Sequence, residues 1–292
     1  MLSAQQVPMP APPSRRPGGV YPARSILVPS KVPGMDYALN PYVGCAFGCT
    51  YCYATFMGRL VGRKPQDWGR FVYAKANLES VMARELRRLG RRPANLFMSS
   101  VTDPYQGVER RWQLTRRALE LLVAHGFTGR LQVLTRSPLV CRDIELLEQI
   151  HHDVGITITS SSDSVSRAFE GASPSVERRL EALAQLNARG LDTHAFVGPL
   201  FPHLLEAPRQ LDRLFGAIAE TGCKEVYVAH FNLSRSIRDR VQAGLARDDQ
   251  ALWNRWYRDP IGRPTKAALG RQVRQLLKRH GLLLREGVII DH

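Results

Sequence analysis

Three cysteines on one short stretch are the residues of this chain whose types and spacing most clearly indicate chemistry. Cys45, Cys49 and Cys52 follow the spacing CxxxCxxC, with glycines at Gly44 and Gly48. Three thiolates can hold three corners of an iron–sulfur cube, whereas four ligands close such a cluster or a structural zinc site. The spacing therefore predicts an iron–sulfur cluster with one open iron, at which a molecule other than the protein can bind.

A zinc site is the alternative interpretation of the same loop. It would need a fourth ligand from Cys141, Cys223 or a histidine. The paired ligand spacing that is typical of structural zinc sites does not recur elsewhere in the sequence. The iron–sulfur interpretation is therefore favoured.

The elements that must position this loop alternate between short apolar strands and amphipathic helices. Strands are expected at residues 95–100, 131–135, 154–159, 193–197 and 225–231. Helices are expected at residues 77–89, 112–125, 142–150, 174–188 and 207–220, the fourth of them capped by Ser173 with Pro174 at its first position. The alternation predicts an α/β fold with parallel strands, either a barrel or a doubly wound sheet, and it directs attention to the carboxyl ends of the strands.

The two ends of the chain differ from this central region. Residues 1–30 carry seven prolines among small and basic residues, a composition that predicts a disordered arm. Residues 31–235 are expected to form the core domain. Residues 236–292 are expected to form a basic, helical C-terminal extension, in which the apolar run at residues 282–290 could add an edge strand.

The cysteine loop, with Tyr51 just before its last cysteine, resembles the signature loop of the radical S-adenosylmethionine superfamily. Together with residues 102–106, 135–138 and 142–143 it is similar to the spore photoproduct lyase-like family. This resemblance implies a partial (βα)6 TIM-type barrel and a 4Fe-4S cluster held by the three cysteines, with S-adenosylmethionine on the open iron. It further implies a 5′-deoxyadenosyl radical that abstracts hydrogen from a substrate, and a one-electron reductant such as flavodoxin or ferredoxin as a partner.

Polar side chains stand where the strands are expected to end, and these are the candidate S-adenosylmethionine contacts. Ser99, Ser100, Thr102 and Asp103 follow the strand at residues 95–100 and resemble the position where the family contacts the methionine ammonium. The alternative is a polar strand-to-helix turn in which Asp103 only sets the geometry of the loop.

Two later strands end on candidates of the same kind. Thr159 and Ser161 offer hydroxyls to ribose or carboxylate groups, although a serine-rich helix cap would look identical. His230 could bond adenine or relay a proton, although a lone histidine is more often a structural residue. Tyr51 and Tyr53 flank the last cysteine and could relay a hydrogen atom to or from the radical, or could simply pack the loop against the barrel.

The sequence departs from the lyases at several positions. Spore photoproduct lyases have a hydrogen-donating cysteine near the end of the second strand, whereas residues 97–109 contain none. Cys141 could replace it only if its loop folds over the site, and a small buried hydrophobe is the other interpretation. Gly107 and Gly171 stand where the family commonly has proline. The resemblance therefore supports radical initiation and leaves the lyase reaction open.

The overall charge favours an anionic partner. The chain of 292 residues has a net charge of +15, and lysine occurs only at positions 31, 64, 75, 224, 266 and 278, so that arginine carries most of the positive charge. Arginine forks suit phosphate oxygens, which makes DNA or RNA a candidate partner, although a high-GC genome also substitutes arginine for lysine on ordinary surfaces. A non-catalytic, nucleic-acid-binding protein with a structural metal loop is therefore the alternative to an enzyme.

The sequence predicts a cytoplasmic protein. It contains no apolar run of the roughly 18 residues that a membrane span requires, and its N-terminal segment lacks the apolar centre of a secretory signal. Three of its five cysteines lie too close together for a sensible disulfide framework, which indicates a reducing compartment. The oligomeric state cannot be predicted from these features.

Overall fold

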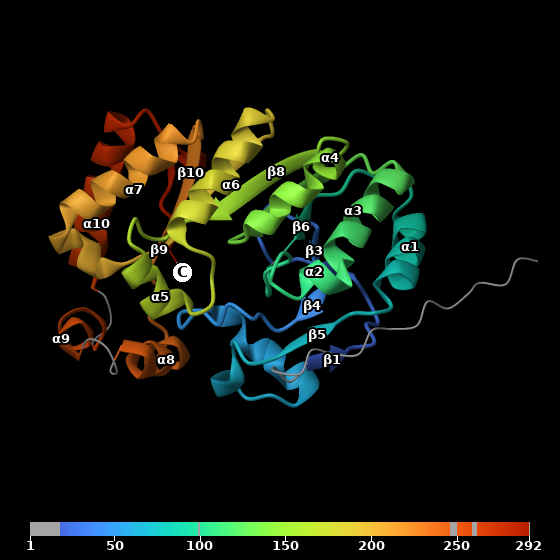
Figure 1. Ribbon diagram of the computed structural model, residues 1–292, viewed down its shortest axis with the longest axis horizontal. Coiled ribbons are helices and arrows are strands. Elements are labelled where there is room, and N and C mark those ends of the chain that lie inside the picture. Colours follow the sequence, from blue (N-terminus) through green and yellow to red (C-terminus); the bar gives the residue numbers. More distant parts are fainter. Residues whose placement is uncertain (1–17, 99, 246–249, 259–261, 292) are drawn as a thin grey trace, which may run out of the picture.

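The computed structural model of the chain describes residues 18–98, 100–245, 250–258 and 262–291. Within these ranges the strands form an eight-stranded sheet in the order β11-β10-β9-β8-β7-β6-β3-β2 and a smaller sheet in the order β1-β5-β4. Figure 1 shows α1, α3, α4, α6, α7 and α10 in an arc around the strands of the large sheet, with the small sheet at the bottom of the view. The large sheet thus has helices along its outer face.

Parallel strands form the centre of the large sheet. In the described part of the chain these are β3 (Tyr37–Leu39), β6 (Leu96–Met98), β7 (Arg130–Thr135), β8 (His151–Thr157), β9 (Thr193–Leu200) and β10 (Glu225–His230). Each pairs in parallel with the next. At the edges, β2 (Leu27–Pro29) runs antiparallel to β3, and β11 (Leu283–Leu284) runs parallel to β10. The α/β class and the partial (βα)6 barrel are therefore confirmed.

The five expected helices occur in the expected order, as α1, α3, α4, α6 and α7, while α2 and α5 were not expected. The bounds of these helices are α1 (Leu78–Leu89), α2 (Glu109–Trp112), α3 (Leu114–His125), α4 (Ile144–Leu147), α5 (Asp163–Glu170), α6 (Val176–Ala188) and α7 (Pro208–Glu220). The expected cap of α6 is wrong. Its N-cap is Ser175, whose hydroxyl accepts a hydrogen bond from the Arg178 amide at 3.3 Å, because the helix begins two residues later than Pro174 suggested.

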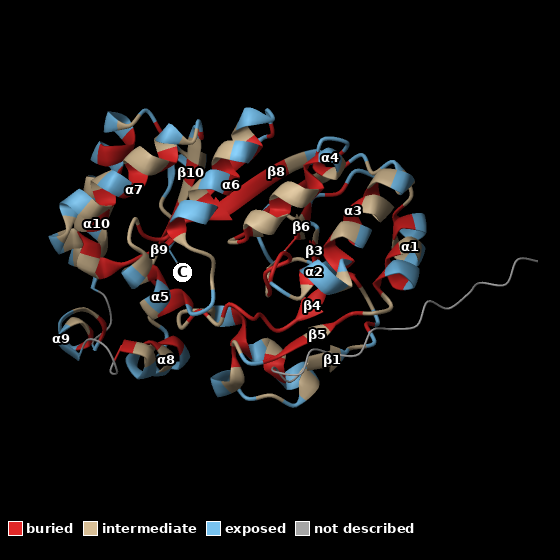
Figure 2. Cartoon of the chain, in the orientation of Figure 1, coloured by how far each residue is buried: buried red, intermediate tan, exposed pale blue. Residues whose placement is uncertain are grey.

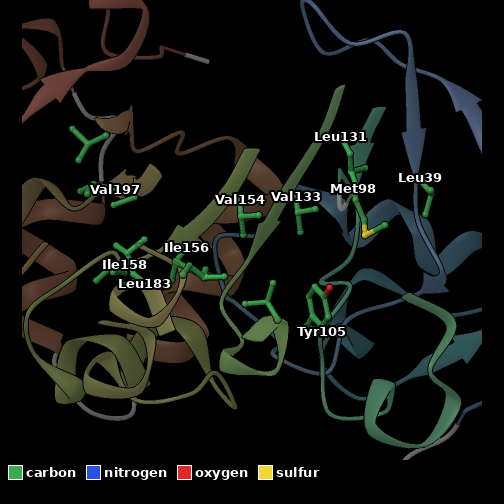
Figure 3. Packing of buried hydrophobic residues seen from close by; sticks show 14 of the residues in the cluster. Leu39, Met98, Tyr105, Leu131, Val133, Val154, Ile156, Ile158, Leu183 and Val197 are labelled. Carbon is green, nitrogen blue, oxygen red and sulfur yellow. The ribbon is translucent and has the colours of Figure 1, made fainter. Parts of the chain in front are cut away.

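The core fills the space between the strands and the helices outside them. Figure 2 shows the strands mostly buried and the outward faces of the helices exposed. Val133, Val154 and Ile156 are fully buried on neighbouring strands, as is Leu183 on α6, and Figure 3 shows these side chains in one apolar layer. Burial of such branched side chains, at about 25 cal/mol per Å² of apolar surface, holds the strand ends in fixed positions.

The predicted disordered arm is too long. Residues 1–17 lie outside the described residues, but residues 18–30 are part of the fold, with β1 (Gly18–Val20) pairing with β5 (Val72–Ala74). Backbone amides of Ile26 and Leu27 donate to the Glu85 carboxylate on α1, and the Ala23 amide donates to Asn77. Proline is tolerated at sheet edges, so a proline-rich composition did not prevent ordered structure here.

The C-terminal residues form helices and then return to the sheet. The elements are α8 (Arg235–Leu245), α9 (Gln250–Leu252), a π-helical turn η5 (Trp253–Tyr257), α10 (Arg263–Arg279), β11 and a 3-10 turn η6 (Arg285–Gly287). The expected edge strand is confirmed at β11, with an isolated bridge between Ala229 and Ile290. No helix in the described ranges is long and apolar enough to span a bilayer.

A buried ion network closes the amino ends of the strands. The Arg285 guanidinium donates to Asp153 at 2.8 Å and lies 2.9 Å from Glu225, while Asp153 also contacts His194 at 2.7 Å and Arg130 at 3.0 Å. Burial alone raises the pKa of Asp153, but the hydrogen bonds and charges of His194 and Arg285 lower it to about 2. Arg285 thereby ties the segment that follows β11 to the amino ends of the neighbouring strands β8, β9 and β10.

Candidate active site at the cysteine loop

The cysteine loop follows β4 (Tyr42–Val43), a strand of the small sheet, and lies between that sheet and the carboxyl ends of the strands of the large sheet. Gly44 has φ of 90°, and a Cβ there would stand 2.5 Å from the Phe71 carbonyl oxygen. Gly48 and Gly69 approach so closely that a Cβ on Gly69 would lie 2.7 Å from the Gly48 Cα. Both glycines of the motif are thus required by backbone geometry, which fixes the path of the chain between the thiols.

Residues after β6 hold the backbone of this loop. The Thr102 hydroxyl donates to the Gly44 carbonyl at 2.6 Å, and the Gln106 amide nitrogen donates to the same oxygen at 3.2 Å. The Ala46 amide donates in turn to Gln106 Oε1 at 2.7 Å. Thr102 and Gln106 are both buried, so these hydrogen bonds are shielded from water. Residues 102–106, the second motif of the sequence, therefore hold the backbone of the cysteine loop in place.

Asp103 links the ends of two neighbouring strands. Its carboxylate accepts hydrogen bonds from the Thr135 hydroxyl at 2.7 Å and from the Tyr105 and Arg136 amides at 2.9 Å each. Burial raises the pKa of Asp103, and the hydrogen bonds from Thr135 and Arg136 oppose that effect. Asp103 thus lies at the carboxyl ends of the strands, as predicted. Its contacts are also those expected if it only sets the geometry of the turn.

Tyr51 joins the cysteine loop to a buried carboxylate. Its hydroxyl donates to Glu170 at the end of α5, and it accepts a hydrogen bond from Arg136 Nη2 at 2.9 Å. The Thr159 hydroxyl, just past the end of β8, donates to the same Glu170 oxygen at 2.9 Å. Burial raises the pKa of Tyr51 well above its usual value, so the phenol stays protonated and remains a donor. The structure thus brings Tyr51 and Thr159 together through Glu170.

Arg179 on α6 balances the charge of Glu170. Its Nη1 lies 2.6 Å from Glu170 Oε2, and both side chains are fully buried. The Ser166 hydroxyl donates to the same oxygen at 2.8 Å. Burial alone would raise the pKa of Glu170, but Arg179 and Arg136, with hydrogen bonds from Tyr51 and Ser166, lower it to about 2. Glu170 is therefore an ionised hub between the cysteine loop and α6.

The other predicted residues lie in different surroundings. The Tyr53 hydroxyl donates to the Ser100 carbonyl, and the Ser100 hydroxyl accepts a hydrogen bond from Asn40 at 3.1 Å. The Ser161 hydroxyl donates to the Gln210 carbonyl on α7 at 3.0 Å, and the His230 amide donates to the Ile290 carbonyl at 2.8 Å. Ser99 lies outside the described residues. Ser100 is therefore next to the cysteine loop, whereas Ser161 and His230 contact the outer helices and the chain end.

The three thiols fit an iron–sulfur cluster by their chemistry. Cys45 and Cys49 are buried among the apolar side chains of Phe47, Trp68 and Phe71, and Cys52 packs against this group. Burial raises the pKa of Cys45 and Cys49, and it raises that of Cys52 to about 11. Within the described ranges, no three His, Cys, Asp or Glu side chains converge closely enough to surround an ion as they stand. The thiols therefore fit the cluster by the type of atom that they offer. All three are soft sulfur ligands, and they come from a single loop whose path is set by glycines.

The remaining two cysteines lie elsewhere. The Cys141 thiol, in the 3-10 segment η3 (Pro138–Asp143), faces the Ala182 carbonyl of α6 at 3.7 Å. Cys223 precedes β10, at its amino end, and its thiol faces the Glu225 carbonyl at 3.2 Å. Cys141 thus packs against an outer helix, in keeping with the small-hydrophobe interpretation, and neither position suits a fourth ligand of a zinc loop.

Sequence reasoning missed three residues that organise the site. Arg136 was part of a recognised motif, and its position at the carboxyl end of β7 was the available signal. Gln106 also belonged to a recognised motif, residues 102–106, but the motif did not indicate its bond to Ala46, 60 residues earlier. Glu170 carried no signal of periodicity, because it reaches the cysteine loop through Tyr51, 119 residues earlier in the chain. Hydrogen bonds of this range depend on the completed fold and not on local pattern.

Comparison with known proteins gives a consistent result. The sequence model described as "Radical SAM superfamily" matches residues 39–230. An uncharacterized protein of Methanocaldococcus jannaschii is 34% identical over 185 residues, which cover 63% of this chain and 68% of that protein. An uncharacterized protein of Mycobacterium bovis is 32% identical over 225 residues, which cover 75% of this chain and 66% of that protein.

Named relatives are more distant. The spore photoproduct lyase of Geobacillus sp. is 24% identical over 183 residues, and the match covers 62% of this chain but only half the length of that lyase. Among solved structures, a spore photoproduct lyase complexed with dinucleoside spore photoproduct aligns with a TM-score of 0.67 at 20% identity, over 91% of this chain and 81% of that chain. That likeness shows a shared fold. With the family match over residues 39–230, which include all three thiols, the chain belongs to the radical SAM superfamily, whose members use a 4Fe-4S cluster and S-adenosylmethionine.

Proposed function

We propose that this radical SAM enzyme abstracts hydrogen from a nucleic-acid substrate. The single observation that carries the active-site assignment is the anchoring of the thiol loop over the strand ends, by Thr102 and Gln106 on one side and by the Tyr51–Glu170 bond on the other. When bound, the cluster and S-adenosylmethionine supply the electron transfer and the 5′-deoxyadenosyl radical. The protein's part is to hold, orient and shield them.

The residues assigned to S-adenosylmethionine come from the strand ends. They are Ser99, Ser100, Thr102, Asp103, Thr159, Ser161 and His230, of which Ser99 lies outside the described residues. Those beside the cysteine loop are the stronger assignments, because Ser100, Thr102 and Thr159 connect to it through hydrogen bonds. Arg136 joins them as a cation whose guanidinium lies 3.4 Å from Glu170 and is 19% exposed. A guanidinium in that position suits the carboxylate of the methionine group.

The two tyrosines take different roles. The Tyr51 hydrogen is committed to Glu170, so Tyr51 acts as a positioning residue that ties the loop to α5. The Tyr53 hydroxyl donates to a neutral group, the Ser100 carbonyl, and Tyr53 is the more exposed of the two tyrosines. Desolvation raises the pKa of Tyr53 to about 12, so that it carries its hydrogen at neutral pH. Tyr53 is therefore our candidate for relaying a hydrogen atom.

A nucleic-acid substrate is supported by charge and by the relatives. The chain has a net charge of +15, mostly from arginine, which suits a phosphate backbone. The named relatives are spore photoproduct lyases, and one solved lyase holds a dinucleoside. Residues 97–109 contain no cysteine, and Cys141 faces α6, so a different residue must supply any hydrogen that the lyase reaction returns.

The test is substrate-stimulated formation of 5′-deoxyadenosine. The reconstituted protein is reduced anaerobically with S-adenosylmethionine in the presence of UV-irradiated DNA, undamaged DNA, RNA or cell extract. We expect at least tenfold stimulation by one of the nucleic acids over the unstimulated rate. Stimulation by nuclease-treated extract alone would contradict a nucleic-acid substrate. Salt-dependent DNA binding without any 5′-deoxyadenosine would instead support the non-catalytic alternative.

The electron donor is assigned to the surface that follows Cys52. The 3-10 segment η1 (Tyr53–Val61) begins at the next residue and exposes Tyr53, Phe56 and Leu60. Arg59 lies over the Phe56 ring at 5.5 Å, and Lys64 is exposed just beyond. Apolar groups ringed by cations next to the cluster loop suit an acidic one-electron donor such as a flavodoxin or ferredoxin.

Charge reversal at this surface should slow reduction by a protein donor. We expect Arg59→Glu with Lys64→Glu to lower the rate of cluster reduction by flavodoxin about tenfold or more at low salt, because rim charges act on association. Reduction by dithionite should not change, since a small reductant needs no docking. The matched control is Arg271→Glu with Lys278→Glu on α10, which Figure 1 places apart from the segment after the cysteine loop. Equal slowing in both double variants would contradict the assigned surface.

A further inference from the structure

Arg240 reaches from the C-terminal extension to the cysteine loop. It stands on α8, beyond residues 39–230 that the superfamily model matches. Its Nε donates to the Thr50 carbonyl at 3.1 Å, and its Nη2 donates to the Cys52 carbonyl. Its Nη1 donates to the Thr55 hydroxyl at 3.3 Å. One guanidinium therefore holds the loop on both sides of the third cysteine.

The surroundings of Arg240 fix its direction. Ile237, Val241 and Leu245 bury one face of α8, and a Cβ on Gly244 would lie 3.1 Å from the Thr50 side chain, so the helix packs closely on the loop. Nη1 also donates to the Ser236 carbonyl of its own helix at 3.0 Å. A planar guanidinium with four such acceptors has little freedom to turn away.

The opposite side of the loop is anchored independently. The Thr50 amide donates to the Phe169 carbonyl on α5 at 2.8 Å, and the Thr50 hydroxyl donates to the same oxygen at 3.2 Å. The Cys52 amide donates to the Cys49 carbonyl at 3.2 Å. Of the contacts to this segment described above, only those from Arg240 bring a full positive charge to the carbonyl of a cluster ligand. That charge lies where it favours the more negative, reduced form of a cluster.

We propose that Arg240 is a positioning residue of the cluster site, which couples the C-terminal extension to the cysteine loop and sets the reduction potential of the cluster from the Cys52 side. This inference rests on the proposed function for the presence of the cluster. The charge effect and the positioning effect are separable, because lysine keeps the charge of arginine but has one nitrogen in place of the three that contact the loop. Methionine keeps much of the length of the side chain and removes both the charge and the hydrogen bonds to the loop.

The test compares Arg240→Met and Arg240→Lys with Arg235→Met, which removes the same charge from an exposed position on the same helix. Redox titration of the reconstituted cluster, followed by EPR without S-adenosylmethionine, should show a lower midpoint potential in Arg240→Met. We expect about a tenfold change in the reduction equilibrium, or about 59 mV for a one-electron couple. Arg240→Lys should retain most of the potential, and Arg235→Met should behave as the unsubstituted protein.

Positioning is read in the apo protein. Amide hydrogen exchange over residues 49–55 should be about tenfold faster in Arg240→Met and in Arg240→Lys than in Arg235→Met. Equal potentials and equal exchange in Arg240→Met and Arg235→Met would overturn the inference while leaving the proposed function intact. Failure of the unsubstituted protein to bind any cluster would overturn both. If Arg240→Met does not fold, unaltered exchange in Arg240→Lys would be the contradicting result.

Discussion

Replacing Cys45 with alanine should abolish formation of 5′-deoxyadenosine, with a loss of at least a thousandfold from the anaerobically reconstituted protein. The reason is that three thiols are the smallest set that holds a 4Fe-4S cluster with one open iron, and all three come from one loop. Removing one thiol leaves only two protein ligands for the 4Fe-4S cluster, among buried apolar side chains. The measurement is chromatographic detection of 5′-deoxyadenosine after reduction with dithionite, together with iron content. Cys49→Ala and Cys52→Ala should behave alike.

The matched control is Cys141→Ala. Its thiol faces the Ala182 carbonyl on α6, so its loss should change the rate less than about twofold. Iron content near that of the unsubstituted protein in Cys45→Ala, with 5′-deoxyadenosine still formed, would contradict the assignment of the loop. Loss of activity in Cys141→Ala with the cluster intact would instead show that Cys141 has a chemical role.

Replacing Arg179 with methionine should lower the free energy of unfolding of the apo protein by about 3–5 kcal/mol, the usual cost of breaking a buried ion pair. Arg179 is fully buried, and it also donates to the Ser166 hydroxyl at 2.9 Å and the Pro174 carbonyl at 2.9 Å. The substitution leaves the Glu170 carboxylate with less compensation for its burial. Chemical denaturation of the apo protein measures the effect without reference to the cluster.

The neighbouring Arg178→Met is the control, because Arg178 is exposed on the same helix. Its substitution should change the free energy of unfolding by about 0.5 kcal/mol or less.

The pH dependence of the free energy of unfolding gives a second check. Because the folded pKa of Glu170 is depressed from 4.5 to about 2, its stabilisation is present above about pH 4.5 and is lost as the pH falls toward 2. Equal stability of the two variants at neutral pH would contradict the hub role of Glu170.

The general architecture could be predicted because it rests on local pattern. The helix expected at residues 77–89 is α1, and the strand expected at residues 131–135 is β7, since both have strong periodicity and clear termini. The cysteine loop was evident for a similar reason: its ligands are neighbours in sequence. Features with a short sequence range were therefore recovered well.

The site was only partly predictable, because side chains that are close in the sequence bond to different parts of the fold. Thr159 and Ser161 are two residues apart at one strand end, yet Thr159 donates to Glu170 in the interior while Ser161 donates to Gln210 on α7. Arg240 contacts Thr50 across 190 positions of the chain, and no local pattern indicates that pairing. Residues 18–30 were misjudged for the same reason, since their order depends on Glu85 and Asn77 of a later helix.

The network at the amino ends of the strands has a consequence for the synthesis of the chain. Arg285, which contacts both Asp153 and Glu225, follows Asp153 by 132 residues. At elongation rates of about 5–20 residues per second, Asp153 waits on the order of ten seconds for this partner. The nascent barrel must therefore pass through a stage in which its amino-end face is open and its buried carboxylate is only partly compensated. Closure of this network therefore waits for Arg285, and before Arg285 arrives Asp153 has only His194 and Arg130 as partners in the network.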